Sequence, residues 1–203
     1  MTPIPVSGSL PDGYQEVLAW RVTGKPARML SIQIMAAISF VIFGFVFFRL
    51  AVSLGKLPTH IPFGLGEIGA VLLGILLAMG LHELTHGLVM QMFGAKPKYG
   101  ILWKGMMLYA TTPGYAYPRT SYIVITLAPF VFISTLVIIG MWLLPGTLWV
   151  PLLAICGIFN ASGAIGDMWM MMIVLRYPAT AYVMDERDGI RLFLPIAFAQ
   201  STS

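Results

Sequence analysis

Uncharged stretches dominate the chain and predict four membrane-spanning helices. The first stretch, Met29 to Phe48, has 20 residues without a charge, which is enough to cross a hydrocarbon layer about 30 Å thick. Further apolar spans are expected near Glu67–Phe93, Tyr122–Leu144 and Leu148–Leu175. The last two are separated by Pro145-Gly146, a pair that favours a turn. The pattern therefore predicts an all-α membrane protein with about four transmembrane helices.

The loop between the second and third predicted spans is the one segment that favours β-structure. Tyr99–Trp103 and Met106–Tyr109 flank Lys104-Gly105, and a short turn between two apolar runs predicts a small β-hairpin in this middle loop. In the polar tail, Asp185–Gly189 is predicted to form a turn. The chain then divides into an N-terminal segment, a four-span membrane domain and a tail: residues 1–28, 29–175 and 176–203.

The composition also favours the bilayer. Hydrophobic residues make up 58% of the 203 positions and charged residues only 10%, with a mean hydropathy of +0.86, whereas soluble domains carry about 25% charged residues. Cys156 is the only cysteine, which excludes an internal disulfide and a cysteine-based metal site. The N-terminal segment contains Asp12 and Glu16 and no apolar core, which does not fit a secretory signal peptide.

The basic residues predict the orientation of the chain. Four spans would place both termini and the middle loop on one side, and that side would hold ten of the 12 Lys and Arg residues. Arg49 and Lys56 fall on the opposite side. An excess of positive charge marks the cytoplasmic side, so we expect cytoplasmic termini in a multi-pass protein of a bacterial or archaeal cell membrane. Anionic lipid headgroups account for the basic loops, and we expect the lipid bilayer as a partner and no nucleic acid.

A polar motif interrupts the second predicted span. His82, Glu83 and His86 form an H-E-x-x-H pattern within an apolar stretch. Positions i and i+4 of a helix share a face, so both imidazoles can reach one metal ion. The carboxylate between them is then placed to act on a metal-bound water. Polar side chains are unfavourable inside a bilayer, which indicates a function for these three.

Asp167 is the candidate for the third metal ligand, because catalytic zinc usually has three protein ligands and one water. It is the sole charged residue inside the fourth predicted span. His86 lies seven residues before Phe93, and Asp167 lies nine residues before Arg176. At a rise of about 1.5 Å per residue, these positions are roughly 10 and 13 Å from the same boundary. We therefore expect the predicted ligands to lie at one level of the membrane.

The role of Asn160 and the role of the His and Asp side chains both remain open. Asn160 lies seven residues before Asp167 on the same predicted helix face, where it could hydrogen-bond a substrate carbonyl, steady the site or serve helix packing. The His and Asp side chains could also form a buried polar cluster that holds helices together without metal.

These residues resemble the DUF3267 family of membrane proteins, which are classed as zincin peptidases. The shared segments are Leu10–Tyr14, His82–Gly87 with the following Phe93–Gly100, and Asn160–Asp167. More distantly, the chain is similar to the site-2 protease class of intramembrane metalloproteases. In that class a helix-borne H-E-x-x-H motif and an Asp on a later helix bind zinc, and an Asn precedes that Asp. The resemblance implies peptidase activity that depends on Zn²⁺.

The predicted function is a zinc metallopeptidase that hydrolyses peptide bonds at or within the membrane. His82, His86 and Asp167 would bind Zn²⁺, and Glu83 would be the general base. The substrate would be a membrane-associated protein or peptide, held extended against the hairpin near Trp103. Two other functions remain open: a membrane scaffold or metal-handling protein with a structural His–Asp cluster, and a zinc hydrolase of a lipid or small amide.

Overall fold

The structure is a computed structural model that describes residues 8–62, 64–103 and 107–196. The chain divides into two compact units. Unit 1 comprises residues 1–30, 83–128 and 167–203, and unit 2 comprises residues 31–82 and 129–166. Four of the helical segments, residues 26–50, 65–92, 119–143 and 165–175, have residues in both units, whereas the segment 149–163 belongs to unit 2 alone.

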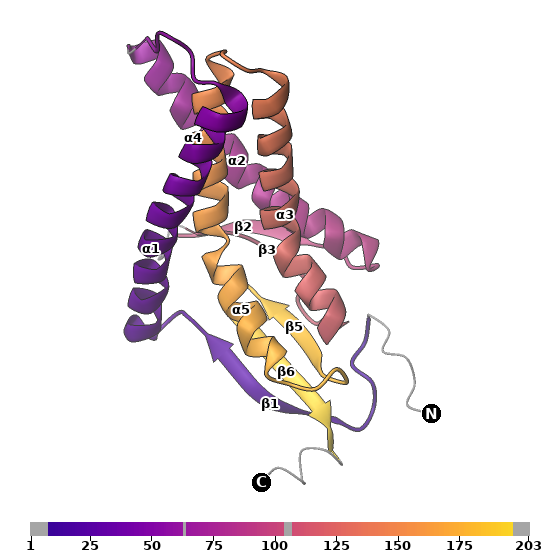
Figure 1. Cartoon of the computed structure of the whole chain (residues 1–203). Coiled ribbons are helices and arrows are strands. Elements are labelled where there is room, and N and C mark those ends of the chain that lie inside the picture. The colour runs from indigo at the N-terminus through magenta and orange to yellow at the C-terminus, as the bar shows by residue number, and fades with distance from the viewer. Residues whose placement is uncertain (1–7, 63, 104–106, 197–203) are drawn as a thin grey trace. The chain divides into compact units, whose positions relative to one another are not determined.

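Helices account for most of the described chain, as the uncharged stretches predict (Figure 1). Their bounds are α1 Pro26–Leu50, α2 Leu65–Met92, α3 Arg119–Leu143, α4 Trp149–Gly163 and α5 Ile165–Leu175, with one π-helical turn, η1 Ala51–Gly55, after α1. Four segments are long and apolar enough to cross a membrane: Pro26–Gly55, Leu65–Met92, Arg119–Leu143 and Trp149–Leu175. The four predicted apolar spans are therefore confirmed as helices. Their insertion in a bilayer and the cytoplasmic termini stay predictions.

Unit 2 is a helical unit with an apolar core. Its buried residues come from α1, η1, α3 and α4, and they are Phe47, Ala51, Ile133, Val137, Met141, Val150, Ala154 and Ala161. Glycines bring the helices close together. At Gly157 a Cβ atom would overlap the ring of Phe47, and at Gly74 it would meet Leu152. Large apolar side chains such as Val41 and Leu76 are exposed, which is typical of a surface that faces lipid rather than water.

Unit 1 contains a four-stranded antiparallel sheet that the sequence analysis did not predict. Its strands are β1 Tyr14–Arg21, β4 Ala116–Pro118, β5 Tyr182–Glu186 and β6 Gly189–Pro195, in the order β1-β6-β5-β4. The description as all-α with a single hairpin is therefore corrected, because the N-terminal segment and the tail pair with each other. The predicted turn at Asp185–Gly189 is confirmed in part: the chain turns at Arg187 and Asp188, whereas Asp185 and Glu186 belong to β5 and Gly189 begins β6.

A second, two-stranded sheet lies in the segment where the sequence predicts a hairpin. β2 Lys98–Leu102 and β3 Met107–Thr111 are antiparallel, and Lys98 pairs with Thr111. The predicted turn at Lys104-Gly105, together with Met106, lies outside the described residues. The placement of this hairpin on the cytoplasmic side stays a prediction.

Candidate metal centre

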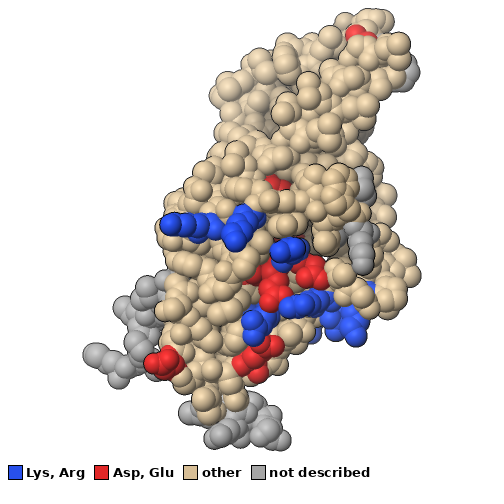
Figure 2. All heavy atoms as spheres, turned by 180° about the vertical axis from the view of Figure 1, so that it is seen from behind, with Lys and Arg blue, Asp and Glu red and all other residues tan. Residues whose placement is uncertain are grey.

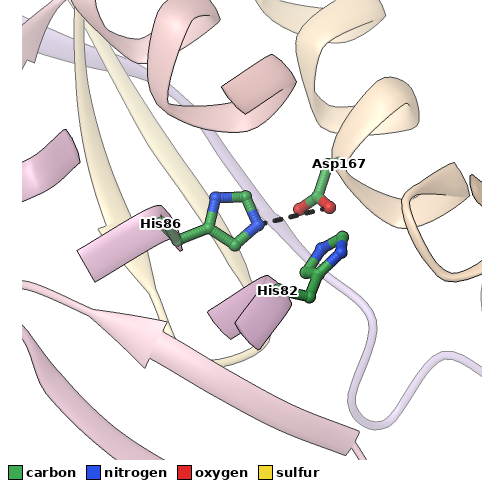
Figure 3. Close-up of side chains that lie close together, drawn as sticks. All are labelled: His82, His86 and Asp167. Atoms are coloured by element: carbon green, nitrogen blue, oxygen red, sulfur yellow. Dashed lines mark ion pairs between the residues drawn. The ribbon is translucent and has the colours of Figure 1, made fainter. Parts of the chain in front are cut away.

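Helix α2 places His82 and His86 about one turn apart on the same face. Both residues are buried, with 8% and 6% of their surface exposed. Asp167 lies in the first turn of α5, where the positive end of the helix dipole favours a carboxylate. Its Oδ2 atom is 3.3 Å from Nε2 of His86 (Figure 3). The structure therefore brings the predicted carboxylate to the H-E-x-x-H motif.

The three side chains form a group that could hold a metal ion. One ligand atom from each of His82, His86 and Asp167 lies within 4.8 Å of the other two. Zinc binds imidazole nitrogen and carboxylate oxygen at about 2.0–2.2 Å in a tetrahedral arrangement, so neighbouring ligand atoms are about 3.3–3.5 Å apart. The separation of 3.3 Å between His86 and Asp167 matches that spacing. Two nitrogens and one carboxylate oxygen also form a donor set that catalytic zinc uses.

Both imidazoles are oriented through their Nδ1 atoms. Nδ1 of His82 is 3.0 Å from Oδ1 of Asn160, and Nδ1 of His86 is 2.9 Å from the backbone carbonyl oxygen of Ile125. A histidine that binds metal through one nitrogen usually donates its other N–H to an oxygen of this kind. In such an arrangement Nε2 is the nitrogen through which each ring would bind a metal ion.

Asn160 lies beside the group, but its amide already contacts other parts of the fold. Only 2% of the residue surface is exposed. Its Oδ1 faces His82, and its Nδ2 donates to the backbone carbonyl of Pro129 at 3.4 Å. These contacts support the reading in which Asn160 steadies the site. The predicted contact with a substrate carbonyl stays a prediction.

Glu83 flanks the face of α2 that carries the histidines and is half-buried. The hairpin reaches the next turn of this helix through Tyr99 of β2. A Cβ atom at Gly87 would overlap the Tyr99 ring, so the absence of a side chain permits this close approach. The hairpin therefore lies against the turn of α2 that follows His86.

A buried carboxyl group lies in unit 1, on strand β5: that of Asp185. The Tyr122 hydroxyl donates to Oδ1 of Asp185 at 3.3 Å, and the Thr111 hydroxyl donates to the Asp185 backbone carbonyl at 3.2 Å. Burial raises the pKa of the Asp185 carboxyl to about 7, although its hydrogen bonds and the nearby His86 act in the opposite direction. The sequence analysis missed this residue because it assigned Asp185 to a turn.

The other acidic side chains of the four-stranded sheet are paired with arginines at its surface. Arg21 pairs with Glu186, and Arg191 pairs with Glu16 and lies 3.9 Å from Glu186. Figure 2 shows acidic side chains lying among basic ones on one face. Exposed pairs of this kind contribute little to stability.

Comparisons with known proteins match the part of the chain that contains this site to a family described as zincin peptidases. The profile of the DUF3267 family, described as "Putative zincin peptidase", matches residues 75–182, a range that includes the H-E-x-x-H motif, Asn160 and Asp167. The chain is also 32% identical over 120 residues to an uncharacterized 24.7 kDa protein in the gap 5′ region of Pyrococcus woesei. That match covers 57% of this chain and 51% of the relative, so the chain matches about half of that protein's length. No solved structure matches the chain significantly.

Proposed function

The chain belongs to the DUF3267 family, and on that premise we propose that it is an integral-membrane zinc metallopeptidase. The observation that carries the proposal is the group of buried His82, buried His86 and half-buried Asp167, whose ligand atoms lie within 4.8 Å of one another. The hydrogen bonds at the two Nδ1 atoms support it further, because they orient both rings for binding through Nε2.

The residues of the group have distinct roles in this proposal. His82 and His86 hold zinc as neutral imidazoles, and Asp167 contributes one negative charge. Zinc, when bound, supplies Lewis-acid activation of a water molecule and of the scissile carbonyl group. Glu83 accepts the proton of the attacking water and delivers it to the nitrogen of the leaving amine.

The hairpin supplies a place for an extended substrate. A peptide bond within an intact helix is inaccessible, because its carbonyl is engaged in the helical hydrogen bonds. A substrate segment could instead add as a strand to an edge of the β2–β3 sheet, where main-chain hydrogen bonds hold it extended. The packing of Tyr99 against Gly87 supports this role, since it keeps the sheet beside the helix turn that carries His86.

We propose that the four apolar helices cross a cell membrane with the termini in the cytoplasm. In this orientation the group lies near the cytoplasmic boundary, and water reaches it from that side. The substrate is then a membrane-associated protein or peptide.

Zinc content and cleavage by matched variants test the proposal. Purified wild-type protein should contain about one zinc per chain by elemental analysis, and His86→Ala and Asp167→Ala should lose most of it. Glu83→Gln should retain zinc and lose cleavage of labelled casein and of a labelled single-span peptide with a central Pro-Gly break in proteoliposomes. Glu67→Gln, on the same helix outside the motif, is the control and should retain both. Full cleavage by Glu83→Gln would contradict the assigned base.

The contact between His86 and Asp167 also supports a second candidate function. At 3.3 Å the two side chains can form a buried pair that holds α2 and α5 together without metal, as a membrane scaffold would require. Absence of bound zinc from the purified wild-type protein would favour this function. Bound zinc with hydrolysis of a lipid or small amide, and none of either peptide probe, would favour a hydrolase of another class.

A further inference from the structure

Two backbone carbonyls of α3 control the orientation of the motif histidines. Ile125 and Pro129 are four residues apart on this helix, which corresponds to about 6 Å along its axis. The Ile125 carbonyl contacts Nδ1 of His86 directly at 2.9 Å. The Pro129 carbonyl is connected to His82 through the side chain of Asn160. Both imidazoles are therefore held from one turn of α3.

Proline at position 129 explains why the Ile125 carbonyl can bind a side chain. In a regular α-helix, the carbonyl of residue 125 accepts the N–H of residue 129. Proline has no N–H to donate and its ring displaces that carbonyl. Ile125 is buried, with 1% of its surface exposed, and a buried carbonyl requires a donor. Nδ1 of His86 lies at hydrogen-bond distance and supplies that donor.

The same chemistry determines the protonation of both rings. A carbonyl oxygen only accepts, so His86 must carry its proton on Nδ1 to bond Ile125. The Pro129 carbonyl likewise requires the Asn160 amide nitrogen to face it. The Asn160 oxygen then faces His82, which must also donate from Nδ1. Each neutral ring is left with its lone pair on Nε2, the atom that in His86 faces Asp167.

We propose that Pro129 is a positioning residue for the metal centre. It leaves the Ile125 carbonyl available to His86, and its own carbonyl orients Asn160 and thereby His82. Both histidines are thus held as Nδ1–H tautomers that present Nε2. The consequence for zinc affinity depends on the proposed function, whereas the consequence for the tautomers does not.

Imidazole nitrogen shifts in the metal-free protein test the proposal directly. With ¹⁵N-labelled histidine, at a pH where the imidazoles are neutral, NMR distinguishes Nδ1–H from Nε2–H. Wild-type His82 and His86 should both show Nδ1–H, with His60→Gln used to assign the remaining histidine. An Nε2–H tautomer at either motif position of the wild-type protein would overturn the proposal, and this measurement requires no variant at position 129.

Pro129→Ala is the decisive variant, because it restores an N–H that competes for the Ile125 carbonyl. We expect a mixture of tautomers at His86 and zinc affinity about 10–100-fold weaker in chelator competition. Pro151→Ala is the matched control. Pro151 lies in the first turn of α4, where backbone N–H groups have no partner within the helix, so both measurements should stay unchanged.

The outcomes separate this proposal from the proposed function. Pro129→Ala protein that keeps Nδ1–H on His86 and wild-type zinc affinity would refute the positioning role while leaving the peptidase intact. Wild-type protein that binds no zinc would refute the peptidase, and the tautomer comparison would still decide the role of Pro129. A proline that only shapes the helix would change thermal stability without moving the tautomers.

Discussion

Replacement of Asp185 by Asn should make the protein more stable at neutral and alkaline pH. Burial raises the pKa of this carboxyl from about 4 in the unfolded chain to about 7 in the folded protein. Between these two values the folded state binds a proton that the unfolded state does not bind. Wild-type stability should therefore fall as the pH rises through this window, and the full loss should be present above about pH 7.

The size of the effect follows from the shift in pKa. A difference of about three pKa units corresponds to on the order of 4 kcal/mol of unfolding free energy at pH 8. For a chain of this length, 1 kcal/mol changes Tm by about 2–4 °C, so the expected gain is on the order of 10 °C. The amide oxygen of Asn can still accept from the Tyr122 hydroxyl, which donates to Oδ1 of Asp185 in the wild type.

Thermal unfolding followed by tryptophan fluorescence in detergent measures this gain. The five tryptophans provide the signal, and a fixed scan rate between pH 4.5 and 8.5 keeps the comparison valid if unfolding is irreversible. Asp185→Asn should exceed the wild type at pH 8 and approach it at the acid end. Asp12→Asn, at an exposed position, is the control and should follow the wild type throughout. Parallel curves for Asp185→Asn and wild type would refute the reasoning.

Three further predictions concern the metal centre and its surroundings. Asn160→Leu should weaken zinc binding about 10–100-fold in chelator competition, while His86 keeps its Nδ1–H tautomer in NMR spectra of the metal-free protein. Gly87→Ala should lower the unfolding free energy by about 1–2 kcal/mol, because overlap with the Tyr99 ring exceeds the gain in helix propensity; adding Tyr99→Ala should restore stability in denaturant titrations. Removing zinc with a chelator should lower Tm, and resupply at 100 times Kd should recover about 2.7 kcal/mol.

The apolar spans and the grouping of His82, His86 and Asp167 could be predicted because each depends on local or periodic features of the sequence. A run of uncharged residues indicates a span whatever lies beside it, and an i, i+4 pair of histidines shares a helix face. The level of Asp167 followed from counting residues to the span ends. The structure places Oδ2 of Asp167 3.3 Å from Nε2 of His86, whereas the depth of both residues in a membrane stays a prediction. The assignment of the three side chains as zinc ligands stays a prediction.

The four-stranded sheet could not be predicted in the same way, because β1 pairs with β6 and β4 with β5 over long distances in the sequence. Glu16 of β1 and Arg191 of β6 interact across 175 positions. β1 is mostly exposed, and β6 is largely buried, so neither shows the alternation that marks a half-buried strand. The burial of Asp185 was missed for a similar reason, because its side chain contacts Tyr122 of α3, which lies 63 positions away in the sequence.

The hydrogen-bond partners of the motif histidines could not be predicted from the sequence for a different reason. The acceptor for His86 is the backbone carbonyl of Ile125. Every residue has a backbone carbonyl, so the residue type at position 125 does not indicate this hydrogen bond. The informative residue is four positions later, where Pro129 stands inside an apolar helix. A proline inside a span indicates a carbonyl that needs another donor. The donor in this fold is His86 because packing brings α2 against that turn of α3, so the chemistry of the motif depends on a residue that contributes no side-chain ligand.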